Sequence, residues 1–265
     1  MTTDPATASI PNLLGTGSRH YPNAPIIEAV IDLQTDFKSR PSPGDFRPLI
    51  ATLQGRFPTA VELSDLQVAV NVPPGTPPAP RVDTHVGQIG WRLTDTANSR
   101  VVQIRQTGFT YSHLPKYTTW EVFSGEAKSV WQEFVRAMSP ATVTRVAVRF
   151  INRIEVPKQR FEPREYFRLY PEIPIGIPDE INGMFMQLQM AQRDIGPDVT
   201  AVLNLALIPP DKPNTVPILF DIDVFAQRSF EPESPEVWST IEQFRTRKNE
   251  IFEASITDES RRLFL

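Results

Sequence analysis

PIIEAVIDLQTDF (Pro25–Phe37) and TRVAVRFINRIEV (Thr144–Val156) are the two stretches that decide the predicted fold. Each alternates apolar with polar residues, which is typical of a strand with one buried face. Successive residues of a strand point to opposite sides, so residues four apart share a face. Each stretch carries three like charges at this spacing: Glu28, Asp32 and Asp36 in the first, and Arg145, Arg149 and Arg153 in the second.

Opposite signs at equal spacing suggest that the two strands pair with each other. One antiparallel register sets Glu28 opposite Arg153, Asp32 opposite Arg149 and Asp36 opposite Arg145. Cross-strand ion pairs contribute about 0.2–1 kcal/mol each, so three of them specify register more than they supply stability. The alternative interpretation is that each charged face meets solvent and the matching spacing is a coincidence.

Length and composition describe a folded soluble protein. The 265 residues fit one large domain or two halves with a common core. Apolar residues make up 40% of the chain, with both charge signs well represented. The net charge of −4 argues against indiscriminate binding of DNA or RNA.

Cysteine usage and hydropathy indicate the compartment. The sequence has no cysteine, which removes disulfides, thiolate nucleophiles and cysteine metal ligands and fits a reducing environment. No apolar run approaches the roughly 20 residues that span a bilayer, and the N-terminus lacks the basic-then-apolar order of a signal peptide. We therefore expect a cytoplasmic protein with no membrane contact.

The chain divides into a lead-in and two halves. Residues 1–21 are rich in Thr, Ser, Pro and Gly without a sustained period, so we predict a mobile N-terminal segment. Residues 22–140 and 141–265 then each show the element order β-α-β-β-β-α. Strands are expected at 25–37, 65–72, 85–94 and 100–107 in the first half, and at 144–156, 184–192, 199–208 and 216–225 in the second.

Capping signals place the helices. Ser42 and Asp45 have capping-box spacing before a short helix that runs to about Leu53, and Ser234 with Pro235 opens the long C-terminal helix. Further helices are predicted at 124–138 and 163–170. The segment TGFTYSHLPKYTTW before the first of these is rich in turn residues and aromatic side chains, and Pro73–Pro80 (PPGTPPAP) is predicted to form a stiff connection.

These elements predict an α+β protein built on a large, mainly antiparallel curved sheet with helices on one face. Both halves share this sheet, and each opens with its charged strand, so the two charged strands are expected to meet at the centre. The element order is similar to that of the TATA-binding-protein saddle, in which two related halves share one sheet. A fold analogy of this kind does not imply DNA binding.

Four motifs carry a resemblance to a known family. PNAPIIEAVIDL, RVAVRFINRIEVP, DIDVF and KNEIFEASITDESRRLF, in this order, resemble a sporadically distributed bacterial family of uncharacterised proteins of about this size. The resemblance covers most of the chain after Tyr21, and its most specific parts are RxxxRFINRI and NEIFEASIT. It implies a bacterial protein in one full-length unit, in a mobile or defence-related gene context, and it implies no activity and no catalytic residue.

The second charged strand supplies the candidate ligand-binding residues. The side chains of Arg145, Arg149 and Arg153 can bind phosphate or carboxylate groups through their guanidinium forks, unless Glu28 and Asp32 already pair with them. Asn152 is the polar residue of the otherwise apolar face of this strand. A buried amide must be hydrogen-bonded, so it either fixes neighbouring backbone or points into a pocket.

Acidic residues give an alternative metal site. Asp221 and Asp223 in FDIDVF share a strand face, and with Glu28 or Asp32 nearby they could hold Mg²⁺ through carboxylate oxygens. Exposure to solvent or pairing with arginine is the competing interpretation. The three histidines, His20, His85 and His113, lack the spacing of a metal site or a catalytic dyad, and we expect a surface or turn position for each.

The sequence leads to two functional hypotheses. It contains no Gly-rich phosphate loop, GxSxG elbow or HExxH helix, so we expect a non-enzymatic binding protein without a cofactor. Its sheet face or the groove between the halves would engage another protein or a small ligand. The alternative is a divalent-metal-dependent hydrolase or nuclease that uses the acidic strand residues; nucleic-acid binding would need the three arginines unpaired.

Overall fold

The computed structural model describes residues 19–71, 81–115, 117–157, 162–174, 176 and 181–265. The predictions made for residues 1–18 and for Pro73–Pro80 lie outside these described residues. The elements of the described chain are β1 Ile26–Asp36, the 3-10 helix η1 Pro43–Phe46, α1 Arg47–Leu53, β2 Thr59–Asn71, β3 Arg81–Thr94, β4 Arg100–Arg105, β5 Gly108–His113, α2 Trp120–Met138, β6 Thr142–Val156, α3 Pro163–Tyr166, β7 Phe185–Ala191, β8 Val199–Leu207, β9 Val216–Ala226, α4 Pro235–Ser255 and α5 Asp258–Arg262.

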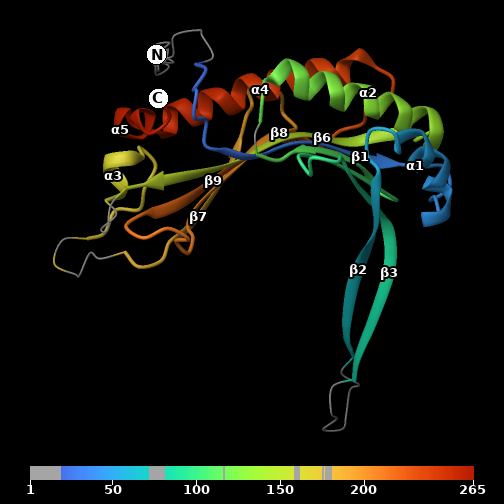
Figure 1. The fold of residues 1–265 in the computed structure, drawn as a ribbon, viewed down its shortest axis with the longest axis horizontal. Coiled ribbons are helices and arrows are strands. Elements are labelled where there is room, and N and C mark those ends of the chain that lie inside the picture. The colour runs from blue at the N-terminus through green and yellow to red at the C-terminus, as the bar shows by residue number, and fades with distance from the viewer. Residues whose placement is uncertain (1–18, 72–80, 116, 158–161, 175, 177–180) are drawn as a thin grey trace, which may run out of the picture.

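All nine strands join one antiparallel sheet in the order β2-β3-β4-β5-β1-β6-β9-β8-β7. The sheet curves, and the long helices α2 and α4 lie side by side over one of its faces (Figure 1). The predicted α+β class, with a large antiparallel sheet and helices on one side, is therefore confirmed.

The two charged strands are neighbours at the centre of the sheet, but in a different register from the predicted one. β1 and β6 pair antiparallel with Val30 opposite Arg149 and Asp32 opposite Ala147, two residues away from the expected pairing. Bulges between Ile26 and Glu28 and between Gln34 and Thr35 shift the register further at both ends. A slip of two residues leaves every side chain on its original face, so sequence alternation cannot distinguish the two registers.

One hydrophobic core fills the space between the sheet and the helices. It takes side chains from the helix side of the strands and from helices at both ends of the molecule. Helix contributions include Leu49 of α1, Phe123 and Trp131 of α2, Tyr166 of α3 and Phe244 of α4. The covered face of the sheet is therefore the apolar face that the two charged strands predict.

Helix ends follow the sequence signals. The Thr119 side chain accepts a hydrogen bond from the Val122 N–H at the start of α2, and Ser139 in a left-handed conformation (φ 49°) ends this helix. The Ser234 hydroxyl accepts from the Glu236 N–H at the start of α4, as predicted. These side chains satisfy backbone N–H groups that the first helical turn leaves unpaired.

The prediction missed one strand. The aromatic segment before α2 forms β5, whose six residues are all buried between β4 and β1. Gly108 opens this strand with φ +149°, and a Cβ there would lie 2.3 Å from the carbonyl oxygen of Leu33. The first half therefore has the order β-α-β-β-β-β-α, one strand more than the predicted repeat. Phe109–Ser112 alternates aromatic with polar residues, a strand signal that the interpretation of this segment as rich in turn residues overlooked.

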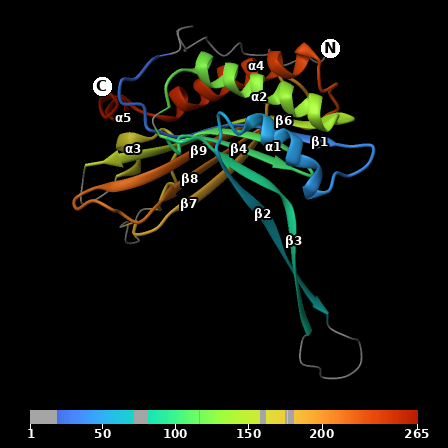
Figure 2. The same cartoon turned by 45° about the vertical axis from the view of Figure 1, so that its right-hand side comes forward.

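β2 and β3 continue beyond the sheet as a two-stranded arm. β3 pairs with β4 only from Gly90 to Thr94, whereas its pairing with β2 extends to the Asn71–Arg81 pair. The arm leaves the sheet on the side away from α2 and α4 (Figures 1 and 2). A hairpin without further neighbours is only marginally stable in water, so the arm is the least supported of the described strands.

Candidate interaction face of the sheet

The sheet has one face without helices, which we call the open face; it carries Asp32, Arg145, Arg149, Asp221 and Asp223. In the described part of the chain the helices pack on the opposite face, where the core lies (Figure 2). Strand alternation explains this division, because the charged and the apolar residues of β1, β6 and β9 occupy alternate positions.

A first hydrogen-bonded group crosses the open face from β4 to β9. Arg105 Nη2 donates to Asp32 Oδ1 at 2.6 Å and to the Thr110 hydroxyl at 2.8 Å, and that hydroxyl donates to the same carboxylate oxygen. Arg145 then bridges two strands: Nη1 donates to Asp32 Oδ2 at 3.1 Å and Nη2 to Asp223 Oδ2 at 2.7 Å. Arg145 therefore joins the two charged centres of β1 and β9.

A second group continues from β6 to the edge strand β7. Arg149 donates two parallel hydrogen bonds of 2.8 Å to the Asp221 carboxylate, the bidentate geometry that guanidinium and carboxylate favour. Asn204 donates to Asp221 Oδ2 at 3.0 Å and accepts from the Gln187 amide at 2.8 Å. The two groups together connect the strands from β4 across the sheet to β7.

Burial affects the ionisation of this face. Burial raises the pKa of Asp223 above its usual range, although Arg145 and Arg149 act against this shift. Its Oδ1 atom is buried and has no hydrogen-bond partner in the described structure. The hydrogen bond to Asp221 raises the pKa of Arg149, so this guanidinium stays charged, and its side chain is 46% exposed.

None of the three predicted ion pairs forms among the described residues: Asp32 binds Arg145, and Arg149 binds Asp221. Arg153 lies on the open face, but it binds Glu155 on its own strand and Asp211 in a loop instead of Glu28. Asp36 is paired through the backbone with Thr142, well short of Arg145 along β6. The three arginines are thus neutralised, but mainly by partners that β9 and the loops supply.

Asn152 belongs to the covered face. It is 3% exposed, and its amide donates to the carbonyl oxygen of Phe220, its cross-strand partner, at 3.0 Å. A weaker bond of 3.4 Å reaches the carbonyl oxygen of Phe150. Asn152 therefore lies on the opposite face of β6 from the three arginines with which the sequence analysis grouped it. Its side-chain amide donates hydrogen bonds to backbone carbonyl groups.

The structure does not assemble the predicted metal ligands. Within the described residues, no three His, Asp or Glu side chains come together as a group that could hold a metal ion. Arg145 lies between Asp32 and Asp223, and Arg149 occupies both carboxylate oxygens of Asp221. These carboxylates therefore already have cationic partners.

His113 does not lie on the surface as predicted. It is 6% exposed at the end of β5 and stacks on Phe123 with ring centroids 6.3 Å apart. Its Nδ1 atom has no hydrogen-bond partner in the described structure, and burial lowers its pKa. The reason for the error is the missed strand β5, since burial of this histidine follows from the position of β5 beneath α2.

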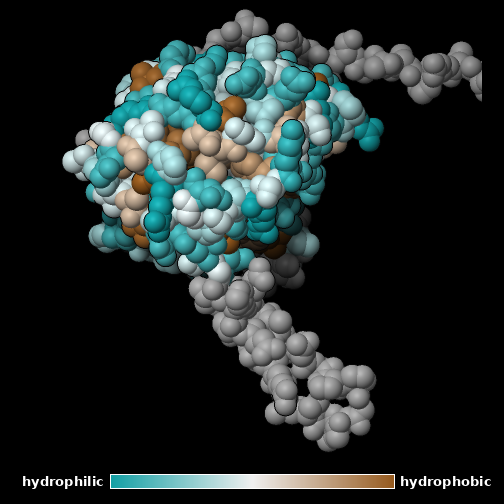
Figure 3. Space-filling view, turned by 90° about the vertical axis from the view of Figure 1, so that its right-hand side faces the viewer, coloured by the Kyte–Doolittle hydropathy of each residue, from teal (hydrophilic) through white to brown (hydrophobic). Residues whose placement is uncertain are grey.

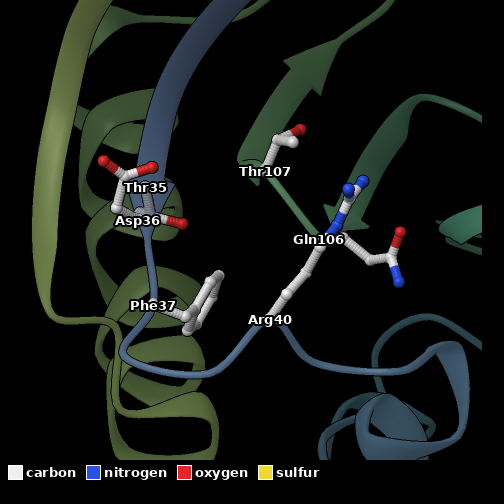
Figure 4. A pocket seen from close by; sticks show the side chains of 6 residues that line it. All are labelled: Thr35, Asp36, Phe37, Arg40, Gln106 and Thr107. Atoms are coloured by element: carbon white, nitrogen blue, oxygen red, sulfur yellow. The ribbon is translucent and has the colours of Figure 1, made fainter.

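Two shallow pockets lie near the ends of strands. One of about 220 Å³ is formed at the end of β1 by Thr35, Asp36, Phe37, Arg40, Gln106 and Thr107 (Figure 4). The other, of about 230 Å³, lies beside α1 at the base of the arm. Viewed from that end of the molecule, the surface is mostly hydrophilic with small hydrophobic areas (Figure 3). Both pockets are open to solvent, so neither has the enclosed shape that is typical of an active site.

Sequence reasoning missed several participants in the open face. Arg105, Thr110 and Asn204 complete its hydrogen bonds. Asp32, the partner of Arg105 and Thr110, lies more than 70 residues away in the sequence, and Asn204 binds Asp221 on the next strand. The alternation of polar and apolar residues in each strand predicts only which side of that strand each of these residues occupies. The strand order, which the sequence does not show, brings them together.

Comparison with protein-family models and with curated proteins found no match to this chain. None of the helices in the described residues combines the length and the hydropathy that crossing a membrane requires.

Proposed function

We propose that this chain is a non-enzymatic binding protein whose open face engages another protein. The observation that carries the proposal is the uncovered face of a nine-stranded sheet, on which ion pairs cancel the charges that strand alternation places there. A sheet face that remains without helices is available for contact, and its composition indicates which class of partner it suits.

The charge balance favours a protein over a nucleic acid. The two hydrogen-bonded groups contain three arginines and three aspartates, which leaves no net charge. Binding of a phosphate backbone depends on an excess of free Lys and Arg side chains. Here the guanidinium groups of Arg145 and Arg149 are already occupied by carboxylates.

Apolar side chains lie between the ion pairs. Val30, Ile151, Val202, Leu219 and Phe225 are half-buried residues of the open face. Phe185 on β7 is 70% exposed and lies on the same side of its strand as Gln187. Protein interfaces combine aromatic anchors with satisfied polar groups in this way.

The two-half organisation belongs to the same proposal. The first strand of each half lies at the centre of the sheet, and each half carries a long helix after its strands. Duplication of a saddle-like unit accounts for this arrangement, with β3 to β5 in the first half corresponding to β7 to β9 of the second and β2 as an additional edge strand. Membership of the sporadic bacterial family stays a prediction from the four sequence motifs.

Site-specific crosslinking tests the proposal. A photoreactive amino acid is placed at Phe185 on the open face and, in a matched variant of the protein, at Val122, which is 49% exposed on α2. Each protein is irradiated inside bacterial cells that carry the native gene, and the crosslinked partner is identified by mass spectrometry. We expect one protein to be crosslinked from position 185 and not from position 122.

The identified partner is then produced and its binding measured by calorimetry. We expect Phe185→Asp to weaken binding roughly 10-fold or more, because an interface anchor is lost, and Val122→Asp to leave it unchanged. Equal crosslinking from both positions, or unaltered affinity of the Phe185→Asp variant, would count against the open face as the binding surface.

A further inference from the structure

Lys248 is a buried amine between α4 and the sheet. The residue is 8% exposed, and its Nζ atom lies 3.7 Å from the ring centroid of Phe150 on β6. Among the described residues, no carboxylate lies within ion-pair distance of Lys248. A buried ammonium without a counter-ion is costly, so the neutral amine is favoured here.

Two charged neighbours of Lys248 modify the effect of burial on its pKa. Burial, with a smaller contribution from the repulsion of Arg245, lowers the pKa of Lys248 to about 7, and Glu253 opposes the shift less strongly. A substantial fraction of the amine is therefore unprotonated near neutral pH. An unprotonated lysine amine is a nucleophile.

The Phe150 ring beneath this amine contacts further aromatic rings, and Arg245 is a charged neighbour of the amine. Tyr117 and Trp120 pack on Phe150 with ring centroids 5.5 and 6.4 Å apart, so they share a ring with Lys248. The Arg245 guanidinium lies 5.6 Å above the Trp120 ring and makes one long ion pair of 3.9 Å, with Glu121. Arg245 thus keeps hydrogen-bonding capacity close to the amine.

The small exposure of Lys248 restricts which electrophile can reach it. Lys248 is 8% exposed and packs against the Phe150 ring, so a bulky electrophile such as an aldehyde cofactor or an acyl donor can reach its amine only by displacing neighbouring side chains. Carbon dioxide is small, uncharged and apolar, and it can enter a packed helix–sheet interface during ordinary side-chain motion.

We propose that Lys248 is a carbamylation site, at which the amine reacts reversibly with dissolved carbon dioxide. The Nζ lone pair forms a bond with the carbon of CO₂, and one C–O π pair moves onto oxygen. The nitrogen releases one proton to water, which leaves the anion –NH–COO⁻. This adduct replaces a cation that Arg245 repels with an anion that Arg245 attracts. Burial disfavours the anion as it disfavours the ammonium, so the attraction of Arg245 is what stabilises the adduct.

The site lies on the covered face and does not depend on the proposed function of the open face. The test is ¹³C NMR of the full chain in buffer with ¹³C-bicarbonate near pH 7.5. It is followed by trapping with a trialkyloxonium salt and peptide mass spectrometry, which locates the carboxylated lysine. We expect a carbamate signal assigned to Lys248.

Matched variants make the assignment specific. Lys128 is exposed on α2, with Nζ 5.9 Å from the Trp238 ring, so it tests whether an aromatic neighbour alone is sufficient. We expect the signal to disappear in Lys248→Met, to persist in Lys128→Met, and to fall roughly 5-fold in Arg245→Gln, which removes the stabilising cation. A wild-type protein that is folded by circular dichroism yet shows no carbamate on Lys248 would overturn the proposal, whether or not the variants fold.

Discussion

The two faces of β6 treat charge in opposite ways. On the open face, Arg145 and Arg149 each bind carboxylates beside the solvent. On the covered face, Val148 and Phe150 are buried beneath α4, and Lys248 lies on the Phe150 ring without a carboxylate partner among the described residues. Arginines of the open face are thus paired with carboxylates, whereas burial without a carboxylate partner favours the neutral amine of Lys248 on the covered face.

The largest expected difference between the faces is in packing. Phe150→Ala removes a 2% exposed ring that contacts Trp120, Phe123 and Lys248, and we expect a loss of about 3–5 kcal/mol in the free energy of unfolding. The neighbouring Ile151→Ala on the open face should cost less than about 1.5 kcal/mol. Urea denaturation of both variants measures the two losses in the free energy of unfolding. Equal losses would contradict the assignment of Phe150 to the packed face and of Ile151 to the open face.

The next effect concerns the buried carboxylate of the open face. Asp221 is 3% exposed and accepts hydrogen bonds from Arg149 and Asn204, so Asp221→Ala should cost about 2–4 kcal/mol in the free energy of unfolding. Asp211→Ala is the control, because Asp211 also binds an arginine but its side chain is 61% exposed. We expect the control to lose less than about 1 kcal/mol, and comparable losses in the two denaturation curves would refute a structural role specific to Asp221.

Lys248 should make stability depend on pH. Its pKa is about 7 in the folded protein and about 10.5 when unfolded, so between these values the unfolded state binds a proton that the folded state lacks. Stability of the wild type should therefore rise from pH 7 to pH 10, and the penalty of burying the charge is fully present below pH 7. Lys248→Met removes this penalty.

We expect Lys248→Met to raise the free energy of unfolding by about 1–3 kcal/mol at pH 6.5 and by much less at pH 9.5. Urea denaturation in CO₂-free buffer at these two pH values provides the measurement. Lys128→Met is the control, since this exposed lysine should give the same small change at both values. A gain from Lys248→Met that does not vary with pH would show that the amine is already charged in the folded protein.

The smallest effect distinguishes the observed register from the one that the sequence suggested. Asp32 binds Arg145 at 3.1 Å, and Arg149 binds Asp221. A double-mutant cycle of Asp32→Asn with Arg145→Gln should give a coupling energy of about 0.5–1 kcal/mol, and one with Arg149→Gln a value near zero. The reverse result would favour the predicted register over the observed one.

Alternation predicted much of this architecture because it depends only on neighbouring residues. Both charged strands and the burial of Val146 and Val148 follow from it, whereas the central position of these strands was expected from the element order of the two halves. Helix starts at Ser42 and Ser234 were likewise predictable, since a cap acts on backbone within three residues of itself. Beyond that range, the position of β5 between β4 and β1 was not predicted, and the burial of His113 was therefore missed.

The sequence by itself determined which side of each strand is charged, because the side-chain period of a strand is two residues. Tertiary structure alone decided which charges meet. Strand order brought Asp221 to Arg149 and Arg105 to Asp32, and bulges in β1 set the register that sequence periodicity leaves open. It also placed Lys248 on Phe150, which lies 98 residues earlier in the chain. Burial at this position lowers the pKa of the lysine amine, because desolvation disfavours its charged form.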